Sequence, residues 1–466
     1  MLHPVVVSAQ AWLHEHETEL LQDYQAMLRI PSVEAVALPN APFGKANREA
    51  LDLALALSVK YGFKTADIEG YCGYAEFGKG EKMVMSLGHL DVVPTGPGWK
   101  YPEFGAELHD GYVYARGATD DKGPTMASFY AMRALMAVAP DLGVRFRQVF
   151  GCNEESGFKC VARYVETEEM PTWGIAPDSG WPLCHAEKGI TSLVISAPLY
   201  KGDVELLDIG GGQRPNIVID KVVAKLKVNP PAMAHVKEKV AANWDANVTA
   251  KWEGDILTIE SRGKAAHGAT PFMGDSAATR AFRFLFTIAP TEAEEYFERL
   301  LLVTHPSGVG LGIHGRDDDT GDLTSNVGIV STEGGTVKLL SNIRYPATWK
   351  GEHVGSLATG FFKKLDESWS VTQLGDSPSL YFPLESPLVK VLVEAYREET
   401  GDMTEPFTMG GGTYARAVPN MVSVGTCWPG DGRAHETDER LKVDHLYKAS
   451  RIYAHMLHAL AGLALG

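Results

Sequence analysis

Short apolar runs alternate with helix-like stretches over the first 180 residues, and two of these runs end directly at histidine or acidic residues. Residues 84–87 lead into Gly88 and His89, and residues 144–152 stop just before a pair of glutamates. Between them, residues 123–138 have the apolar spacing of a helix. Alternating strands and helices favour an α/β sheet, in which functional side chains gather at the strand ends. We therefore expect an α/β fold with its site at such an edge.

The charge balance restricts the classes of partner. The chain of 466 residues carries 43 Lys and Arg against 59 Asp and Glu, which gives a net charge of −16. Nucleic acids and anionic membranes both attract basic surfaces, so we expect neither as a partner. No uncharged apolar run approaches the roughly 18 to 20 residues needed to span a bilayer. The amino-terminal segment lacks the basic region and cleavage site of a signal peptide, so we expect a cytoplasmic protein.

The cysteines are odd in number, scattered and without a CxxC pair. This pattern argues against a disulfide framework and a zinc finger, and it favours reduced, mostly buried thiols. The five residues are Cys72, Cys152, Cys160, Cys184 and Cys427.

Two polar segments pair residues whose spacing suits metal binding. In a strand, His89 and Asp91 point to the same side, so the carboxylate can accept the second ring N–H of a metal-bound histidine. A surface turn is the alternative for this pair. Asp120 and Asp121 are adjacent acids, an arrangement that is costly unless a cation or hydrogen bonds compensate. The alternative is that one of them caps the following helix.

Three further segments add carboxylates and an imidazole. Glu154 and Glu155 could divide the labour, one binding a metal and the other acting as general base on a metal-bound water. The alternative for this pair is a solvated face. Asp178 follows a proline in a rigid turn, and His435 lies in a polar loop near the C-terminus.

The spacing of these residues groups them. The steps from His89 to Asp120, from Asp120 to Glu155 and from Glu155 to Asp178 are 31, 35 and 23 residues. Each step is close to the length of one βα unit. His435 comes 257 residues after Asp178, so the chain must return to the first domain. Carboxylates and imidazoles at successive strand ends suit a two-metal centre.

Five segments occur in order along nearly the whole chain: GHLDVVP, RGATDDKGP, NEESG, APDSGWP and AHETDE. In these segments the chain resembles the zinc-dependent aminoacylase, carboxypeptidase and dipeptidase superfamily, and it is most similar to the bacterial dipeptidase V group. The resemblance implies a catalytic domain with a mixed, mostly parallel sheet flanked by helices, interrupted by an inserted α+β lid. We expect the catalytic domain at residues 1–186 and 384–466, and the lid at residues 187–383.

The resemblance also implies the site residues. Two Zn²⁺ ions per chain are implied, and Mn²⁺ or Co²⁺ suit the same donors. Asp91 would orient His89, Glu154 would be the general base, and a cis peptide bond would join Asp120 to Asp121. The implied ligands are His89, Asp120 and Asp178 for one ion, and Asp120, Glu155 and His435 for the other, so that Asp120 bridges them.

The lid segment GKAAHGATP carries His267. The resemblance implies that His267 stabilises the oxyanion of the transition state, a role that can contribute several kcal/mol in a dry site. From the residues alone, His267 could equally be an ordinary turn histidine. A lid of this length resembles the version that supplies its histidine within one chain, so we expect a monomer.

Substrate contacts are implied at two further places. Asn216 and Arg344 match positions that hold the C-terminal carboxylate of the substrate, a group that arginine binds bidentately. A surface ion pair is the alternative for Arg344. Glycines in residues 409–416 would let backbone N–H groups approach a ligand, and a tight turn is the alternative there. We assign Gly411, Gly412 and Thr413 to substrate binding.

These assignments predict a two-metal dipeptidase that cleaves unblocked dipeptides, with β-Ala dipeptides such as carnosine as candidate substrates. The water between the metals would be the nucleophile. Hydrolysis of N-acyl amino acids on the same scaffold is the alternative. A non-catalytic binding protein on an inherited scaffold is disfavoured, because the five ligands and Glu154 are all present.

Overall fold

The computed structural model describes residues 2–466, which divide into two compact units. Unit 1 contains the described residues up to His185, together with Phe382–Phe407 and Gly412–Gly466. Unit 2 contains Ala186–Tyr381 and Thr408–Gly411. The last segment differs from the expectation that everything after residue 383 belongs to the first domain. Backbone contact explains the difference, because the N–H of Lys188 donates to the carbonyl of Met409 at 2.9 Å.

Unit 1 is built on a mixed sheet with the strand order β1-β2-β6-β3-β7-β21-β8. The central pairs β6-β3, β3-β7 and β7-β21 are parallel, whereas β1-β2, β2-β6 and β21-β8 are antiparallel. A small antiparallel sheet has the order β22-β5-β4. The bounds are β1 (Lys64–Ile68), β2 (Cys72–Gly78), β3 (Met83–His89), β4 (Glu107–His109), β5 (Tyr112–Tyr114), β6 (Arg145–Gly151), β7 (Trp173–Ser179), β8 (Leu183–Glu187), β20 (Phe407–Met409), β21 (Met421–Gly425) and β22 (Arg440–Lys442).

The strand β3 is buried along its whole length. Its residues are mostly apolar rather than alternating, as expected for a parallel strand whose two faces are both covered. Because β6, β3 and β7 are parallel neighbours, their carboxyl ends meet at one edge of the sheet. This edge carries His89 at the end of β3, the glutamate pair after β6, and Asp178 near the end of β7.

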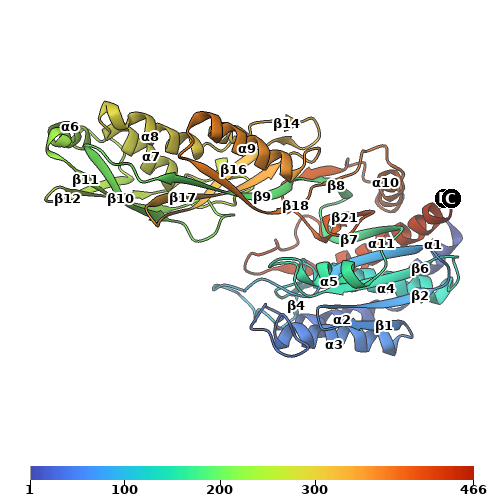
Figure 1. Ribbon diagram of the computed structural model, residues 1–466. Helices are drawn as coiled ribbons and strands as arrows, with labels where there is room; N and C mark the ends of the chain where they lie inside the picture. The colour runs from blue at the N-terminus through green and yellow to red at the C-terminus, as the bar shows by residue number, and fades with distance from the viewer. Residues whose placement is uncertain (1) are drawn as a thin grey trace. The chain divides into compact units, whose positions relative to one another are not determined.

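The helices of unit 1 pack on this sheet and on one another (Figure 1). The helices α4 and α11 contact each other and β3, and α1 contacts both of them. The chain opens with two helices, α1 and α2, which are separated at His16, the residue that caps the end of one and the start of the other. The bounds are α1 (Pro4–Glu15), α2 (Glu17–Leu28), α3 (Lys45–Lys60), α4 (Lys122–Val138), α5 (Lys159–Thr167), α10 (Pro387–Thr400), α11 (Val443–Leu465) and the 3-10 helix η3 (Tyr414–Arg416).

Unit 2 is an α+β unit on an antiparallel sheet with the strand order β12-β13-β11-β10-β16-β17-β9-β18. Its helices α7, α8 and α9 lie on one face of this sheet (Figure 1). The strands β9, β11 and β13 alternate buried and less buried residues, as expected when one face of a sheet packs on a core. The core includes Leu193, Ile195, Phe282, Leu285 and Phe297. The predicted combination of an α/β domain with an inserted α+β domain is thus confirmed.

The elements of unit 2 run from β9 to β19. The strands β14 and β15 form a separate pair, and β19 pairs with the end of β8. The bounds are β9 (Gly189–Pro198), β10 (Val204–Gly211), β11 (Lys221–Val228), α6 (Pro230–Ala241), β12 (Val248–Glu253), β13 (Ile256–Arg262), η1 (Pro271–Met273), α7 (Ala277–Ile288), α8 (Thr291–Val303), η2 (Val309–Leu311), β14 (Arg316–Asp317), β15 (Gly321–Asp322), β16 (Thr324–Glu333), β17 (Thr336–Tyr345), α9 (Gly351–Leu365), β18 (Ser370–Ser377) and β19 (Leu380–Tyr381).

Two general expectations concern the whole chain. Among residues 2–466, the structure has no helix with the length and apolar character needed to cross a membrane. The five cysteines are free thiols, of which four are buried and Cys427 is half-buried.

Candidate metal centre

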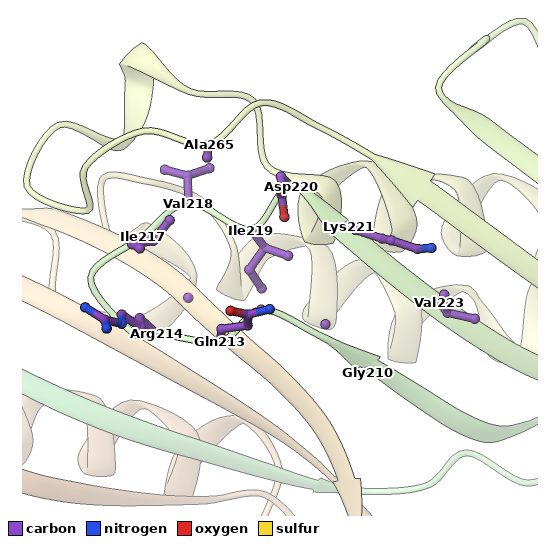
Figure 2. Close-up of a pocket in the computed structure, with 13 residues that line it drawn as sticks. Gly210, Gln213, Arg214, Ile217, Val218, Ile219, Asp220, Lys221, Val223 and Ala265 are labelled. Carbon is purple, nitrogen blue, oxygen red and sulfur yellow. The ribbon is translucent and has the colours of Figure 1, made fainter. Parts of the chain in front are cut away.

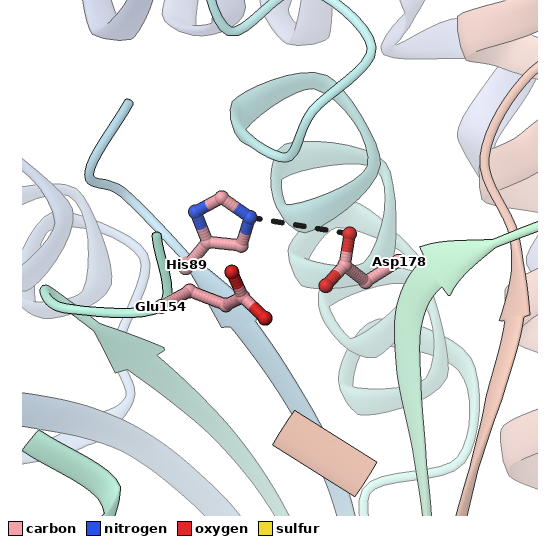
Figure 3. Close-up of side chains that lie close together, drawn as sticks. All are labelled: His89, Glu154 and Asp178. Carbon is pink, nitrogen blue, oxygen red and sulfur yellow. Dashed lines mark ion pairs between the residues drawn. The ribbon is translucent and has the colours of Figure 1, made fainter. Parts of the chain in front are cut away.

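Among residues 2–466, two groups of side chains could each hold a metal ion, with their ligand atoms within 4.8 Å of one another. One group comprises His89, Glu154 and Asp178 (Figure 3). The other comprises Asp120, Glu155 and His435. Unit 1 supplies all six residues, so the return of the chain after unit 2 does bring His435 back to the sheet edge.

Asp120 connects the two groups. One carboxylate oxygen, Oδ1, lies 3.0 Å from Nε2 of His89, and the other, Oδ2, lies 3.1 Å from Nε2 of His435. His89 also lies 3.9 Å from Asp178 (dashed line in Figure 3), and His435 lies 3.0 Å from Glu155. The structure therefore brings together all five residues that the sequence proposes as ligands, with Asp120 in the shared position.

The role of Asp91 differs from the sequence expectation. Nδ1 of His89 lies 2.9 Å from the backbone carbonyl oxygen of Asp91, and 3.6 Å from its carboxylate. The carboxylate instead accepts hydrogen bonds from the backbone N–H groups of Glu154 at 3.0 Å and Glu155 at 3.1 Å. The main chain of Asp91 thus orients the imidazole, and its side chain holds the glutamate loop.

The contact at Nδ1 also defines what the other ring nitrogen of His89 can do. When Nδ1–H donates to a carbonyl, the lone pair of the neutral ring lies on Nε2. That nitrogen is the one near Asp120 and Asp178. His89 is therefore prepared to act as a metal ligand through Nε2, with its orientation set by the backbone.

The contacts of Asp121, next to Asp120, distinguish a helix cap from a carboxylate that is compensated by other hydrogen bonds. It occupies the N-cap position of α4, but its side chain makes no capping bond to the described helix backbone. Its carboxylate accepts from the N–H of His89 at 3.1 Å and from the hydroxyl of Thr125 at 2.8 Å. The peptide bond between Asp120 and Asp121 is cis, as the resemblance implies.

The electrostatics of the cluster follow from crowded acids at a buried edge. Burial, and then the neighbouring Glu155 and Asp120, raise the pKa of Glu154 well above its usual value. Burial, and then Glu154, raise the pKa of Asp178 in the same way. Hydrogen bonds to Asp120 and Glu155 raise the pKa of His435 to about 10. Neighbouring negative charges contribute to each of these pKa shifts, and a bound cation would offset that charge.

The donor set also fits a divalent ion. The two groups offer carboxylate oxygens and imidazole nitrogens and include no thiol. Such donors suit zinc, manganese and cobalt, and carboxylates shared between ions are typical of two-metal hydrolases.

A cavity of about 550 Å³ borders the cluster within unit 1. Asp120 and Asp178 line one part of it, and residues 426–434 line much of the rest, including Cys427 and Trp428. Sequence reasoning did not select this loop. Its place in the sequence could have identified it, because the loop leads directly to the predicted ligand His435.

Within unit 2, the structure pairs His267 with the segment that carries Asn216. Residues Ile217 and His267 form an isolated antiparallel bridge, and the N–H of Gly268 donates to the carbonyl of Asn216 at 2.7 Å. A side chain at Gly268 would lie 2.9 Å from that carbonyl, so this close approach requires glycine. His267 is exposed, and its Nδ1 accepts from the N–H of Ala269 at 3.2 Å.

The segment before Asn216 borders a cavity of about 480 Å³ (Figure 2). Its lining includes the glycines 210–212, the cationic side chains of Arg214 and Lys221, and Asp220. The three consecutive glycines therefore form part of the wall of a surface hollow in unit 2.

The remaining predicted substrate residues lie in two places. Arg344 is buried, and its guanidinium donates to the side-chain oxygen of Asn342 and to the carbonyl of Gly410, both at 3.0 Å. Gly411 belongs to unit 2, whereas Gly412 and Thr413 belong to unit 1. The hydroxyl of Thr413 accepts from the N–H of Ala415 at 3.2 Å and caps η3.

Comparisons with known proteins identify the family of this chain. Residues 85–459 match the sequence pattern of peptidase family M20/M25/M40. A Staphylococcus epidermidis protein named "Putative dipeptidase" is 35% identical over 462 residues, covering 96% of this chain and 98% of that protein. "Putative dipeptidase YtjP" of Bacillus subtilis is also 35% identical over 462 residues, covering 95% and 97%.

Among solved structures, aminoacylhistidine dipeptidase from Vibrio alginolyticus is similar with a TM-score of 0.57 and 14% identity, covering 95% of this chain and 96% of that one. At this identity the likeness supports the fold. The family match and the relatives support the chemistry. The chain therefore belongs to peptidase family M20/M25/M40 and is a metallopeptidase that depends on divalent metal.

Proposed function

We propose that this protein is a two-metal dipeptidase that hydrolyses the peptide bond of dipeptides with a free amino terminus. The observation that carries the proposal is Asp120, whose two carboxylate oxygens each contact a histidine of a different ligand group. His89 and Asp178 would complete one ion site, and Glu155 and His435 the other. Zn²⁺ is the ion we propose, and Mn²⁺ and Co²⁺ suit the same donors.

Divalent ions bound there would supply Lewis-acid chemistry, polarising the scissile carbonyl and lowering the pKa of water. Glu154 then acts as the general base, which takes a proton from the attacking water and delivers it to the leaving amine. The burial that raises the pKa of Glu154 favours a carboxylate able to hold that proton. The Asp91 carboxylate keeps the loop of Glu154 in place through the backbone N–H.

Unit 2 would serve as the lid that recognises the substrate. An Nδ1 that accepts from Ala269 leaves the proton of the neutral His267 ring on Nε2, as a donor to an oxyanion requires. Arg344 and Asn216 would hold the C-terminal carboxylate of the dipeptide. The residues Gly411, Gly412 and Thr413 would add contacts to the same end of the substrate.

Contacts of unit 2 with the C-terminal carboxylate would favour short substrates, and we propose that these are dipeptides. The names of the Staphylococcus and Bacillus relatives agree with this preference. We further propose that the enzyme works in the cytoplasm as a monomer, that small dipeptides are its partners, and that β-Ala dipeptides such as carnosine are among its substrates.

A substrate panel tests the proposal. The protein is stripped with a chelator, reloaded with Zn²⁺ or Mn²⁺, and assayed with an α-dipeptide, a β-Ala dipeptide, a tripeptide and an N-acetyl amino acid. We expect cleavage of the dipeptides and little cleavage of the other two compounds. Cleavage of the N-acetyl compound alone would keep the metal centre and contradict the dipeptidase assignment. No cleavage by protein that carries two ions would contradict the enzymatic proposal itself.

A further inference from the structure

The segment that carries His435 contains a second, buried carboxylate. Glu439 is 0% exposed and lies four residues after His435, whereas residues 433–437 are exposed. It belongs neither to the two ligand groups nor to the proposed substrate contacts. A buried carboxylate needs partners, and those of Glu439 identify the part of the molecule on which it acts.

The donors that the Glu439 carboxylate binds lie in residues 116–120, the turn that ends at Asp120. One oxygen, Oε1, accepts from the N–H of Thr119 at 2.8 Å, its hydroxyl at 3.1 Å, and the N–H of Asp120 at 3.2 Å. The other, Oε2, accepts from Nη1 of Arg116 at 2.6 Å and from the N–H of Gly117 at 3.2 Å. Charge-assisted bonds of this number hold both partners in one geometry.

The same turn also holds the backbone of the His435 loop. Arg116 is 1% exposed, and the same Nη1 that binds Glu439 donates to the backbone carbonyl of Glu436 at 3.2 Å. The turn before Asp120 and the loop after His435 are therefore joined at two positions, Glu436 and Glu439. Both contacts follow His435 in the chain, one within the exposed residues 433–437 and one just after them, and neither uses the His435 side chain.

His435 needs such support because of its surroundings. Its side chain is 54% exposed, and its neighbours in the loop are exposed as well. A ligand on a loop without anchors must be ordered when the ion binds, and the lost conformational freedom weakens the binding. Partners behind the ligands commonly remove this penalty by fixing the ligand geometry in advance.

We propose that Glu439 is a positioning residue for the second metal position, at which Asp120, Glu155 and His435 meet. Its carboxylate fixes the main chain of Asp120 relative to the loop of His435, so that both ligands converge. The first position shares Asp120, but its other ligands, His89 and Asp178, lie on the strands β3 and β7, so we expect it to depend less on this carboxylate. The inference rests on the proposed function only in taking the second group as a metal site.

The substitution Glu439→Gln tests this role. The amide has nearly the same shape, but its nitrogen cannot accept the backbone N–H groups that one carboxylate oxygen now binds. Glu436→Gln is the matched control, because it makes the same change of charge three residues earlier, on a side chain that is 60% exposed. Bound Zn²⁺ per chain is measured by equilibrium dialysis of the stripped full-length protein.

We expect Glu436→Gln to bind two ions per chain, each with the same affinity as in the wild type. Glu439→Gln should bind the ion at the second position about 10- to 100-fold more weakly, in line with known effects of residues behind metal ligands, and should bind the other ion with a smaller loss of affinity. Excess Zn²⁺ should restore most of kcat while KM stays unchanged. Unchanged affinity for the second ion, or equal weakening of both ions, would overturn the proposal.

A second variant covers the case in which Glu439→Gln does not fold. Thr119→Val keeps the shape of a buried side chain and removes the hydroxyl bond to Glu439. This variant should also lower the affinity for the ion at the second position, by a smaller factor than Glu439→Gln. An unchanged affinity would overturn the positioning role. If the wild type binds only one ion, the two-metal proposal is contradicted. The positioning role then requires that Glu439→Gln lower the affinity for that ion, and an unchanged affinity would overturn it.

Discussion

The metal ligands of unit 1 and the predicted substrate contacts of unit 2 are positioned by different means. In unit 1, six acidic and histidine side chains converge, and the loops that carry them are held by other buried carboxylates, such as Asp91. In unit 2, His267 is exposed, and backbone pairing with the Asn216 segment positions it.

The difference reflects what each kind of site must achieve. An ion requires several donors at once, at fixed mutual distances, and the donors repel one another before it binds. A substrate contact can be made by one side chain at a time, so its position can rest on the main chain alone. Changes to the metal ligands of unit 1 should therefore reduce metal binding and catalysis together, whereas a change to its general base should reduce catalysis alone. Changes in unit 2 should leave metal binding intact.

The largest expected effect separates a base from a ligand within unit 1. Glu154→Gln should lower kcat by about 10²- to 10⁴-fold, because general acid–base catalysis is lost. Bound metal should stay at the wild-type level, since Glu154 is not a proposed ligand. Kinetics and metal analysis of the same preparation measure both quantities, with Glu166→Gln on an exposed helix face as control. Loss of an ion would show that Glu154 is a ligand, as its closeness to His89 and Asp178 allows.

The next effect concerns unit 2. His267→Asn should lower kcat by about 10²- to 10³-fold through the loss of an oxyanion donor, with metal content unchanged. His305→Asn is a matched control, because His305 is exposed in the same unit and its Nδ1 also accepts a backbone N–H two residues later. Equal activity of the two variants would remove His267 from the mechanism. A loss of metal in His267→Asn would contradict the division of labour between the units.

A smaller effect tests how the glutamate loop is held. Asp91→Asn replaces one of the two oxygens that accept the N–H groups of Glu154 and Glu155 by a donor. We expect kcat/KM to fall about 10- to 100-fold, as for other partners behind a metal site. The His89 ring should keep its orientation, because the Asp91 carbonyl holds it, and a crystal structure of the variant can check this. Rotation of the ring would instead favour the carboxylate as its orienting group.

The smallest effect lies outside both sites. Burial, and then His3 and His455, lower the pKa of His458 to about 4. The unfolded chain takes up this proton near pH 6.5, so stability is lost as the pH falls from about 6.5 toward 4. His458→Gln should make the free energy of unfolding less dependent on pH across this window, as measured by urea denaturation of metal-free protein. If the free energy of unfolding depends on pH as strongly in the variant as in the wild type, other groups cause the loss of stability in acid. The acidic residues of the metal cluster would be the first to test.

Much of the candidate site could be predicted because its residues are marked by local patterns. Parallel strands end at one edge, and a histidine or acid directly after an apolar run must therefore lie at that edge. This reasoning identified His89 and Glu155 together with their strands, whereas Asp178, which the sequence places in a rigid turn, lies near the end of β7. Asp120 and His435 needed the resemblance as well, because a helix cap and a surface loop explain their patterns equally well.

The sequence by itself determined the alternation of strands and helices in the first domain and the α/β class, and its resemblance to a known family added the inserted α+β unit and the residues proposed as ligands. Only the tertiary structure decided which atom of Asp91 orients His89, that residues 408–411 belong to unit 2, and that Glu439 binds the turn before Asp120. The physical reason is distance along the chain. Periodicity and spacing report local geometry, whereas the partner of a buried carboxylate can lie more than 300 residues away, as Arg116 and Glu439 do.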